Sequence, residues 1–362
     1  MSSFTTQEKI GQLFFIGIPG PELDDTTVGL LDRIQPGGIC LFARNIRERR
    51  QTRNLLDALR SKLDDPLLSI DQEGGLVDRL RRLMTPVPAA SKLRSVDDAA
   101  ELGRIIAAAL SLLGFNMDFA PVVDVVDERR RSFSNGLTSR AFGSSREDVA
   151  AYASAFLREL GGRGIAGCLK HFPGLGASEV DSHRELPTVS IDENEFFGTD
   201  LYPYRELLAS ELVDGVMVAH AAFQNVGLQE VDQNGKLLPS SLSPAVISNL
   251  LRVELGYDGL VLTDDLEMGA IVENYGIGEA CVMAVEAGAD MLAICASIAA
   301  IDEGHAAIRE AYDSGRISVD RIDESVARIS SLKAALGPPP EFDDDQLESL
   351  SNAVAELNKR LE

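Results

Sequence analysis

The 362-residue sequence has no tryptophan, few aromatic residues and few basic residues, and each shortage limits what the chain can be. Aromatic residues make up 6% of the chain while 45% of it is hydrophobic, so its core must consist mainly of Leu, Ile, Val and Ala. Lys and Arg total 34 against 57 Asp and Glu, which gives a net charge of −23. Because such an acidic chain repels phosphate backbones and anionic lipid, we expect no nucleic-acid partner and no membrane partner.

Long apolar runs and paired cysteines are also missing. No run approaches the roughly 18 apolar residues that a membrane span needs, and the N-terminal segment lacks the pattern of a signal peptide. Cys40, Cys168, Cys281 and Cys295 form no CxxC pair and no Cys/His cluster with metal-ligand spacing. We therefore expect buried free thiols, no bound metal and a cytoplasmic protein.

Eight short apolar runs alternate along the chain with longer helical patterns. The runs are residues 13–18, 37–42, 67–72, 115–124, 166–172, 214–220, 259–265 and 289–295. Runs of this kind are typical of strands buried on both faces of a parallel sheet. The amphipathic patterns at 47–63, 145–160 and 243–255 predict helices. An open doubly wound sheet shows the same local pattern, but the count of eight favours an α/β fold closed into a (β/α)8 TIM-like barrel.

The composition changes near residue 337. We expect residues 1–336 to form a single catalytic barrel, which is a common size for that fold. Gly337 and three prolines then start a Pro-rich, acidic linker that leads into a last helical pattern ending at Glu362. Residues 337–362 are therefore predicted to form a short helical tail outside the barrel core.

Polar residues cluster at the ends of the predicted strands, where barrel enzymes carry their active sites. The chain has only four histidines, and His183 lies in the loop that follows the fifth run. This concentration predicts a shared site at the barrel mouth before any family is considered. The residues at strand ends are Asp71, Lys170, His171, His220, Asp264 and Asp265.

Residues 170–183 form the most informative loop. Asp181 and His183 are two positions apart, which places both side chains on one side of an extended segment. A carboxylate beside an imidazole orients the ring and favours its protonated form, so the pair suits a general acid near neutral pH. The tripeptide alone is weak evidence, because it is more often an exposed segment that has no role.

Asp264 ends an apolar strand, where an acidic group is destabilising unless it has a partner or a role. At a barrel mouth its carboxylate could attack the anomeric carbon of a sugar. The alternative is an N-cap for a following helix, a structural role that Asp265 could fill instead. Several further polar groups could bind sugar hydroxyls: Asp71, Arg79, Arg140, Lys170 and His171.

The chain resembles glycoside hydrolase family 3, in the β-N-acetylhexosaminidase branch that includes bacterial cell-wall recycling enzymes. The resemblance covers about residues 7–335, and its matching segments follow the order of the family. The KHFPG…DSH and TDDL segments are the most specific parts of it. The matching stretches are GGICLFARN (37–45), DQEGGLVDRL (71–80), SRAFG (139–143), KHFPGLGASEVDSHRELP (170–187) and SLSPAVISNLLRVELGYDGLVLTDDLEMGAI (241–271).

The resemblance implies a retaining β-N-acetylhexosaminidase that removes terminal β-linked N-acetylglucosamine, from a small carbohydrate or a muropeptide-like substrate, in two displacements. It implies Asp264 as the nucleophile, and His183 as the acid/base in a dyad with Asp181. Because histidine replaces the second carboxylate of most retaining glycosidases, the carboxylate-separation rule does not apply. No metal or organic cofactor is implied. The implied substrate-binding positions are Asp71, Arg79, Arg140, Lys170 and His171.

Two leucines depart from the family pattern. Leu175 stands where the family usually reads His in PGHG, and Leu76 stands where it usually reads Arg in EGGR. These changes leave the accepted aglycone or peptide open. They also leave open another β-glycoside such as a β-glucoside, phosphate as the acceptor, or a non-catalytic sugar-binding relative. A Schiff-base aldolase using Lys170 is the alternative from a different class.

Overall fold

The apolar runs predicted from the sequence form eight parallel strands, each buried along its whole length. A computed structural model describes residues 4–133, 135–179, 186–228, 230–232 and 235–362. The strands of the barrel are β1 (Phe14–Gly17), β2 (Gly38–Leu41), β3 (Leu67–Ile70), β6 (Met117–Asp118), β7 (Ala166–Phe172), β9 (Gly215–Val218), β11 (Leu260–Thr263) and β12 (Leu292–Ile294).

These strands form one sheet that closes on itself. Their order is β11–β9–β7–β6–β3–β2–β1–β12, and neighbours are parallel throughout. The two ends of the series meet where Leu262 pairs with Met291 and the Thr263 N–H donates to the Met291 carbonyl at 3.1 Å. The predicted (β/α)8 barrel is thus confirmed, and the open-sheet alternative is wrong.

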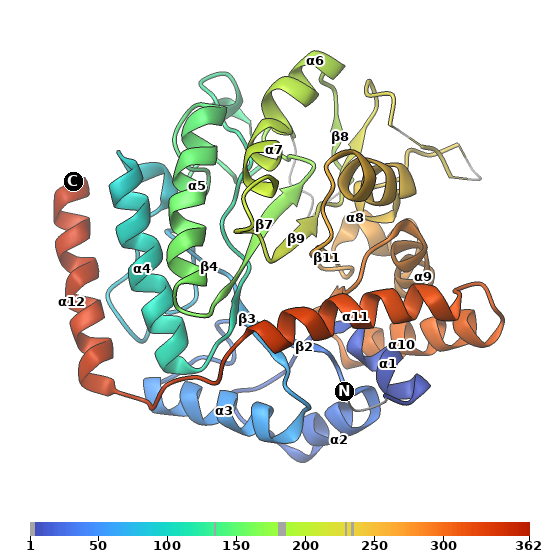
Figure 1. The fold of residues 1–362 in the computed structure, drawn as a ribbon, viewed down its shortest axis with the longest axis horizontal. Helices are drawn as coiled ribbons and strands as arrows, with labels where there is room; N and C mark the ends of the chain where they lie inside the picture. Colours follow the sequence, from blue (N-terminus) through green and yellow to red (C-terminus); the bar gives the residue numbers. More distant parts are fainter. Residues whose placement is uncertain (1–3, 134, 180–185, 229, 233–234) are drawn as a thin grey trace.

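Helices surround the barrel (Figure 1). Among the described residues, no helix combines the length and the apolar character needed to cross a membrane. The α-helices are α1 (Thr6–Gln12), α2 (Asp25–Ile34), α3 (Arg49–Lys62), α4 (Val96–Leu113), α5 (Arg146–Gly161), α6 (Glu193–Glu195), α7 (Tyr202–Leu208), α8 (Gly269–Val272), α9 (Ile277–Ala287), α10 (Ile298–Asp313), α11 (Val319–Ala335) and α12 (Asp344–Leu361). The other helical segments are η1 (Ala90–Lys92), η2 (Arg130–Ser132), η3 (Phe196–Asp200), η4 (Ser240–Leu242) and η5 (Ala245–Glu254).

The three helices predicted from amphipathic patterns are all present, as α3, α5 and η5. Ser145 caps α5, because its hydroxyl accepts the N–H of Asp148 at 3.1 Å. The segment predicted as a helix at 243–255 is a π-helix over η5, with Pro244 just before its first turn. Hydrophobic periodicity located these helices because it reports the buried face, which an α-helix and a π-helix share.

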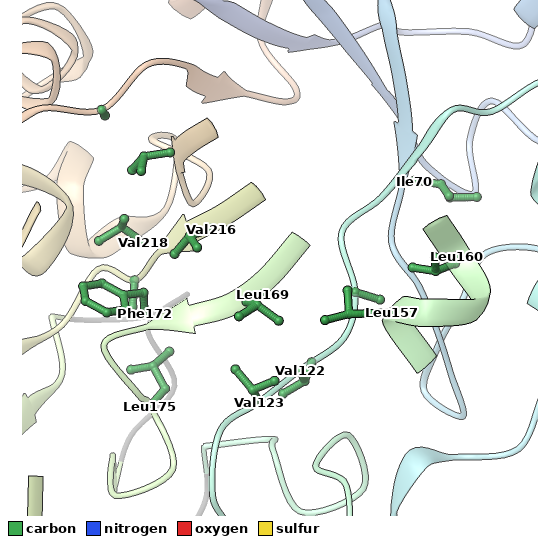
Figure 2. Close-up of a cluster of buried hydrophobic side chains, with 14 of the residues drawn as sticks. Ile70, Val122, Val123, Leu157, Leu160, Leu169, Phe172, Leu175, Val216 and Val218 are labelled. Carbon is green, nitrogen blue, oxygen red and sulfur yellow. The ribbon is translucent and has the colours of Figure 1, made fainter. Parts of the chain in front are cut away.

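The space between strands and helices holds the larger of two apolar clusters. Figure 2 shows Leu169 and Val216 of the sheet together with Leu157 and Leu160 of α5. The smaller cluster fills the barrel interior and includes Phe15, whose ring packs edge-on to that of Phe119 at 5.0 Å. Each fully buried side chain of this size contributes roughly 1.5–3 kcal/mol, so these two layers account for most of the stabilisation of the fold.

All four cysteines are buried and free, as predicted. Cys40 lies in β2, Cys168 in β7 and Cys281 in α9, and Cys295 directly follows β12. Burial raises the pKa of each thiol. These cysteines therefore pack as small apolar side chains rather than as reactive thiolates.

Two short strand pairs outside the barrel were not predicted. β4 (Gln72–Gly74) and β5 (Val77–Asp78) form a hairpin directly after β3, and β8 (Thr188–Val189) pairs with β10 (Ala222–Phe223). Gly74 and Gly75 of the hairpin have φ angles of 91° and 59°, which side chains other than glycine rarely adopt. The hairpin matters for function because it follows the strand end that carries Asp71.

The chain ends in α12, which lies beside α4 on the outside of the barrel (Figure 1). Residues 337–343 connect α11 to α12 without regular structure. The buried face of α12 includes Leu347, Val354 and Leu357, which belong to the larger apolar cluster. The division of the chain into a barrel over 1–336 and a tail over 337–362 stays a prediction.

Lys333 is buried at the end of the barrel that the strands enter, away from the strand ends that carry Asp71 and Asp264. It is 7% exposed, and its ammonium donates to Gln12 Oε1 at 2.7 Å and to the Asp64 carbonyl at 3.4 Å. Burial lowers the pKa of Lys333 from 10.5 to about 8. The neutral amine is therefore more favoured in the folded chain than in the unfolded chain.

This burial predicts how stability depends on pH. Between pH 8 and 10.5 the unfolded chain keeps a proton on Lys333 that the folded chain has lost, so the free energy of unfolding rises with pH in that window. Compared with Lys333→Met, the wild type should gain up to about 3 kcal/mol as pH rises through it. Urea unfolding of both proteins at several pH values measures the difference, and parallel curves would contradict this explanation.

Candidate active site

A cavity of about 230 Å³ opens at the C-terminal ends of the barrel strands. Asp71 and Glu73 follow β3, Lys170 and His171 end β7, and Asp264 follows β11. Seven residues predicted for the site line this one cavity: Asp71, Arg79, Arg140, Lys170, His171, Asp264 and Asp265. The structure thus brings together side chains as far apart in the sequence as Asp71 and Asp265.

Lys170 joins two carboxylates inside the cavity. Its ammonium lies 2.7 Å from Asp71 Oδ1 and 2.6 Å from Glu73 Oε1. Arg140 donates two hydrogen bonds to the same Glu73, at 2.7 Å to Oε2 and 2.9 Å to Oε1. The four side chains form a continuous ion-pair network from β3 across β7 to the loop before α5.

Glu73 is the centre of this network. It is only 5% exposed, so burial alone would raise its pKa, but the charges of Lys170 and Arg140 outweigh burial and hold the pKa of Glu73 at about 2. The same carboxylates raise the pKa of Lys170 above its ordinary value. Glu73, Lys170 and Arg140 are therefore charged at neutral pH, and each depends on the others to compensate for lost hydration.

Glu73→Gln should consequently be strongly destabilising. The amide leaves two buried cations facing a neutral group, a situation that typically lowers the free energy of unfolding by roughly 3 kcal/mol or more. Glu279→Gln is the matched control, since Glu279 meets Arg316 through two N–H groups at 2.7 and 2.8 Å on the exposed surface. An exposed pair contributes at most about 1 kcal/mol. Denaturant unfolding of both variants makes the comparison, and equal losses would count against the network.

His171 is held in a fixed orientation by Asp124. Its Nδ1 lies 2.7 Å from Asp124 Oδ2, while the other oxygen of Asp124 accepts the backbone N–H of Leu175 at 2.6 Å. With the ring proton on Nδ1, Nε2 is an acceptor, and Arg140 lies 3.4 Å from it. His171 is thus oriented by a buried carboxylate and presents one edge of its ring to the cavity.

Asp264 directly follows β11 and is partly exposed, with its side chain at the cavity wall. Its backbone N–H continues the sheet by donating to the Val218 carbonyl at 3.0 Å, and its Oδ1 accepts the N–H of Asp265 at 2.8 Å. Burial alone would raise its pKa, but the nearby His171 and His220, the Asp265 N–H and Lys170 together outweigh burial, and the pKa of Asp264 lies below its usual value. The residue is an anion at neutral pH, as a carboxylate nucleophile must be.

Asp265 fills a structural role, although not the predicted one. Its Oδ1 accepts the N–H groups of Glu267 at 3.1 Å and Cys295 at 3.3 Å, so it closes a turn and ties that turn to the end of β12. No helix starts there, because α8 begins only at Gly269. Burial raises the pKa of Asp265 to about 7, which contrasts with its ionised neighbour.

His220 lies behind the cavity rather than in its wall. It is fully buried, with Nδ1 2.7 Å from Ser241 Oγ and Nε2 3.0 Å from the Asp265 carbonyl. The strand-end pattern that grouped His220 with the site therefore identified a supporting residue. Its ring fixes the Asp264–Asp265 turn and is one of the groups that lower the pKa of Asp264.

Arg79 lies at the rim of the cavity. Its guanidinium is 3.6 Å from Asp71 Oδ2 and stacks over the ring of Phe42, with 5.8 Å to the ring centroid. Arg44 covers the same ring at 4.7 Å. The two cation–π contacts keep Arg79 near Asp71, where it can donate to a bound ligand.

The predicted dyad of Asp181 and His183 lies outside the described residues. The segment that leads to it is fixed at its start, where Asn135 Nδ2 donates to the carbonyls of Gly176 at 3.3 Å and Ser178 at 2.8 Å. A Cβ on Gly176 would come within 2.0 Å of the Val125 carbonyl, so only glycine fits there. The role of the dyad stays a prediction.

The two leucines that depart from the family pattern lie in different places. Leu175 is 6% exposed and lines the cavity, so it presents an apolar surface to a ligand. Leu76 is 72% exposed at the turn of the β4–β5 hairpin and does not belong to the cavity wall. Of the two departures, only Leu175 is therefore placed where it can contact a ligand in the cavity.

Sequence reasoning missed two central residues, Glu73 and Asp124. Glu73 is two positions after Asp71 in DQEGG, a spacing that places both carboxylates on one side of an extended segment. Asp124 ends the fourth apolar run, at the kind of position that singled out Asp264. An inspection of the acidic residues at and just after every predicted strand end would have identified both Glu73 and Asp124.

The position of Lys170 argues against a Schiff-base aldolase. Such a lysine must be neutral to attack a carbonyl, which usually requires an apolar or cationic surrounding. Here two carboxylates bind the ammonium, and they raise its pKa. Lys170 is a fixed cation in this cavity.

Comparisons with known proteins agree on one family. A sequence model described as the glycosyl hydrolase family 3 N terminal domain matches residues 5–332. A protein named beta-hexosaminidase from Alkalilimnicola ehrlichii is 35% identical over 290 residues, which are 77% of this chain and 79% of the relative. Another beta-hexosaminidase, from Methylococcus capsulatus, is 33% identical over 301 residues, or 82% of this chain and 85% of the relative.

Solved structures give the same result. A glycoside hydrolase family 3 beta-N-acetylglucosaminidase from Paenibacillus sp. superposes with a TM-score of 0.87 at 37% identity, covering 98% of this chain and 69% of that chain. The structure described as M tuberculosis LpqI superposes with a TM-score of 0.80 at 31% identity, covering 93% of this chain and 95% of that chain. The similarity extends over the whole barrel.

Proposed function

The chain belongs to glycoside hydrolase family 3, and on this premise we propose that it is a retaining β-N-acetylhexosaminidase that removes terminal β-linked N-acetylglucosamine. The observation that carries the proposal is the anionic Asp264 at the cavity wall, in one cavity with a network of fixed cations and carboxylates. The names of the relatives support the choice of sugar.

The first displacement would use Asp264 as the nucleophile. One carboxylate oxygen attacks the anomeric carbon while His183 protonates the departing glycosidic oxygen. Because Asp264 Oδ1 already accepts the Asp265 N–H, the attack falls to Oδ2. The product of this step is a glycosyl ester of Asp264 and a free aglycone.

In the second displacement water replaces the ester. His183, neutral after giving up its proton, takes a proton from water, which attacks the anomeric carbon and releases Asp264. Two inversions give a sugar with retained configuration. Asp181 would orient the imidazole in both steps, as a carboxylate does in other acid/base pairs.

The other cavity residues would bind the sugar. Asp71 and His171 Nε2 accept hydrogen bonds from hydroxyl groups, whereas Arg79, Arg140 and Lys170 offer donors along the same wall. Their ion pairs and the Asp124 bond fix them before substrate arrives, which reduces the ordering entropy of binding. The cavity is smaller than the roughly 300–1,000 Å³ typical of sites for drug-sized ligands, so it suits one sugar unit.

We propose a small saccharide or muropeptide-like aglycone, and a role in recycling cell-wall fragments in the cytoplasm. Four free cysteines support a reducing compartment. Because Leu175 contributes an apolar surface at the cavity wall, the accepted aglycone is expected to differ from that of relatives with histidine there.

A substrate panel tests the proposal. Nitrophenyl β-N-acetylglucosaminide and the matching β-glucoside are assayed with and without phosphate, and the configuration of the first product is read by NMR. We expect turnover of the N-acetylglucosaminide, a β-configured hydrolysis product, and no dependence on phosphate. Preference for the glucoside, a glycosyl phosphate product, or binding without turnover would each replace the proposal with the corresponding alternative.

A further inference from the structure

α12 packs against the barrel with a face that contains a single polar side chain. Of its five buried residues, four are apolar, and the fifth, Ser351, is 6% exposed. The five positions recur every three or four residues and so form one stripe. A buried hydroxyl is destabilising unless it has a hydrogen-bond partner. The partner of Ser351 therefore identifies the polar contact that this face of α12 makes.

Ser351 binds the segment of residues 83–89, which precedes η1. The Thr85 N–H donates to Ser351 Oγ at 2.8 Å, and the two hydroxyls are 2.9 Å apart. Two helical turns further along α12, Asn358 Nδ2 donates to the Pro86 carbonyl at 3.0 Å. The helix thus holds two consecutive residues of this segment by their backbone groups.

Arg49 of α3 adds a third attachment. Its Nε–H donates to the Leu83 carbonyl at 2.7 Å. Its other two nitrogens bind Asp344 at 3.0 Å and Glu348 at 2.7 Å, both in the first turns of α12. The start of segment 83–89 is therefore connected to α12 through one guanidinium.

The far end of segment 83–89 supports the β4–β5 hairpin. The Val87 carbonyl accepts the Gly75 N–H at 2.9 Å, and the Val87 N–H donates to Asp78 Oδ2 at 3.0 Å. Gly74 packs so closely that a Cβ there would lie 2.2 Å from the Pro88 carbonyl oxygen. With no space between hairpin and segment, a displacement of one moves the other.

This hairpin brings binding groups to the cavity. Glu73 and Val77 lie on its two strands and Arg79 directly follows it, and all three line the cavity. Just beyond segment 83–89, the Ser91 N–H donates to the Ser139 carbonyl at 3.4 Å, next to Arg140. The contacts that begin at α12 and pass through segment 83–89 therefore reach both Glu73 and Arg140.

We propose that α12 positions the β4–β5 hairpin for substrate binding, and that Ser351 is the positioning residue through which it acts. This inference rests on the proposed function of the cavity. It gives a role in the reaction to a helix that lies beyond residues 5–332, the part matched by the family domain.

The test compares three substitutions in the full-length enzyme, with kcat and KM measured on nitrophenyl β-N-acetylglucosaminide. Ser351→Ala removes the acceptor for the Thr85 N–H, and Asn358→Ala removes the bond to Pro86 at a less buried position. We expect each to raise KM by about 3- to 10-fold with kcat within about twofold, because loosened binding groups weaken ground state and transition state alike. Ser351→Thr keeps the hydroxyl and should stay near the wild-type KM.

Ser325→Ala is the matched control. Ser325 is a buried helix serine in α11 whose hydroxyl donates to Asp290 at 3.1 Å, away from the cavity wall. Its loss should lower the thermal midpoint as Ser351→Ala does, without changing KM. The inference is overturned if neither Asn358→Ala nor a folded Ser351→Ala exceeds the control in KM. If the wild type itself shows no turnover, the proposed function is wrong. If the wild type is active and only the KM values of the variants fail to change, the proposed function stands and the role of α12 is wrong.

Discussion

Asp264→Asn should reduce kcat on nitrophenyl β-N-acetylglucosaminide by about 10⁴-fold or more, because an amide cannot form the glycosyl ester. The substitution keeps the shape of the side chain and an oxygen that can accept the Asp265 N–H. The fold should therefore survive, and the thermal midpoint should stay close to that of the wild type. Steady-state kinetics with a matched unfolding curve makes the measurement.

A chemical rescue separates loss of the nucleophile from general damage. In Asp264→Ala the space left by the carboxylate should admit azide, which attacks the anomeric carbon directly. The product would be an α-glycosyl azide, since only one inversion occurs. Residual activity of Asp264→Asn above a few per cent, or rescue that yields a β-configured azide, would contradict the role given to Asp264.

His183→Ala should show the second large effect, and its size should depend on the leaving group. Loss of a general acid typically reduces the rate by about 10²- to 10⁴-fold when the leaving oxygen needs a proton. A dinitrophenyl leaving group needs almost none, so formation of the glycosyl-enzyme from that substrate should be nearly normal. The measurement is kcat/KM across aryl glycosides of increasing leaving-group pKa, for the variant and the wild type.

Ser182→Ala is the control for His183→Ala, because it alters the neighbouring position in the sequence. It should leave the dependence on the leaving group as in the wild type. An equal loss on every substrate in His183→Ala would show that the histidine serves binding or folding, and the proton donor would then have to be another group.

The barrel could be predicted from the sequence because its strands are buried on both faces. Residues 166–169 and 215–219 are apolar without interruption, and this signal does not depend on tertiary contacts. The β4–β5 hairpin could not be predicted in the same way. Its strands have three and two residues, and their pairing depends on Gly74 fitting against segment 83–89.

The location of the site could also be predicted, because parallel strands of a barrel all end at the same face. The partners within the site could not. Glu73 looks like one acidic residue among 57 Asp and Glu in the sequence, and its importance comes only from Lys170 and Arg140 meeting it in the fold. His220 shows the opposite error, since a strand-end position does not reveal whether a side chain points to the cavity or behind it.

The most direct test of the account is to trap the glycosyl-enzyme and find the modified residue. A fluorinated N-acetylglucosaminide with a good leaving group slows hydrolysis of the ester, and mass spectrometry of the digested protein then locates the added sugar. The account predicts one sugar per chain, attached to Asp264. Attachment to Asp265 or Asp71, or full turnover with no trapped ester on any residue, would contradict it.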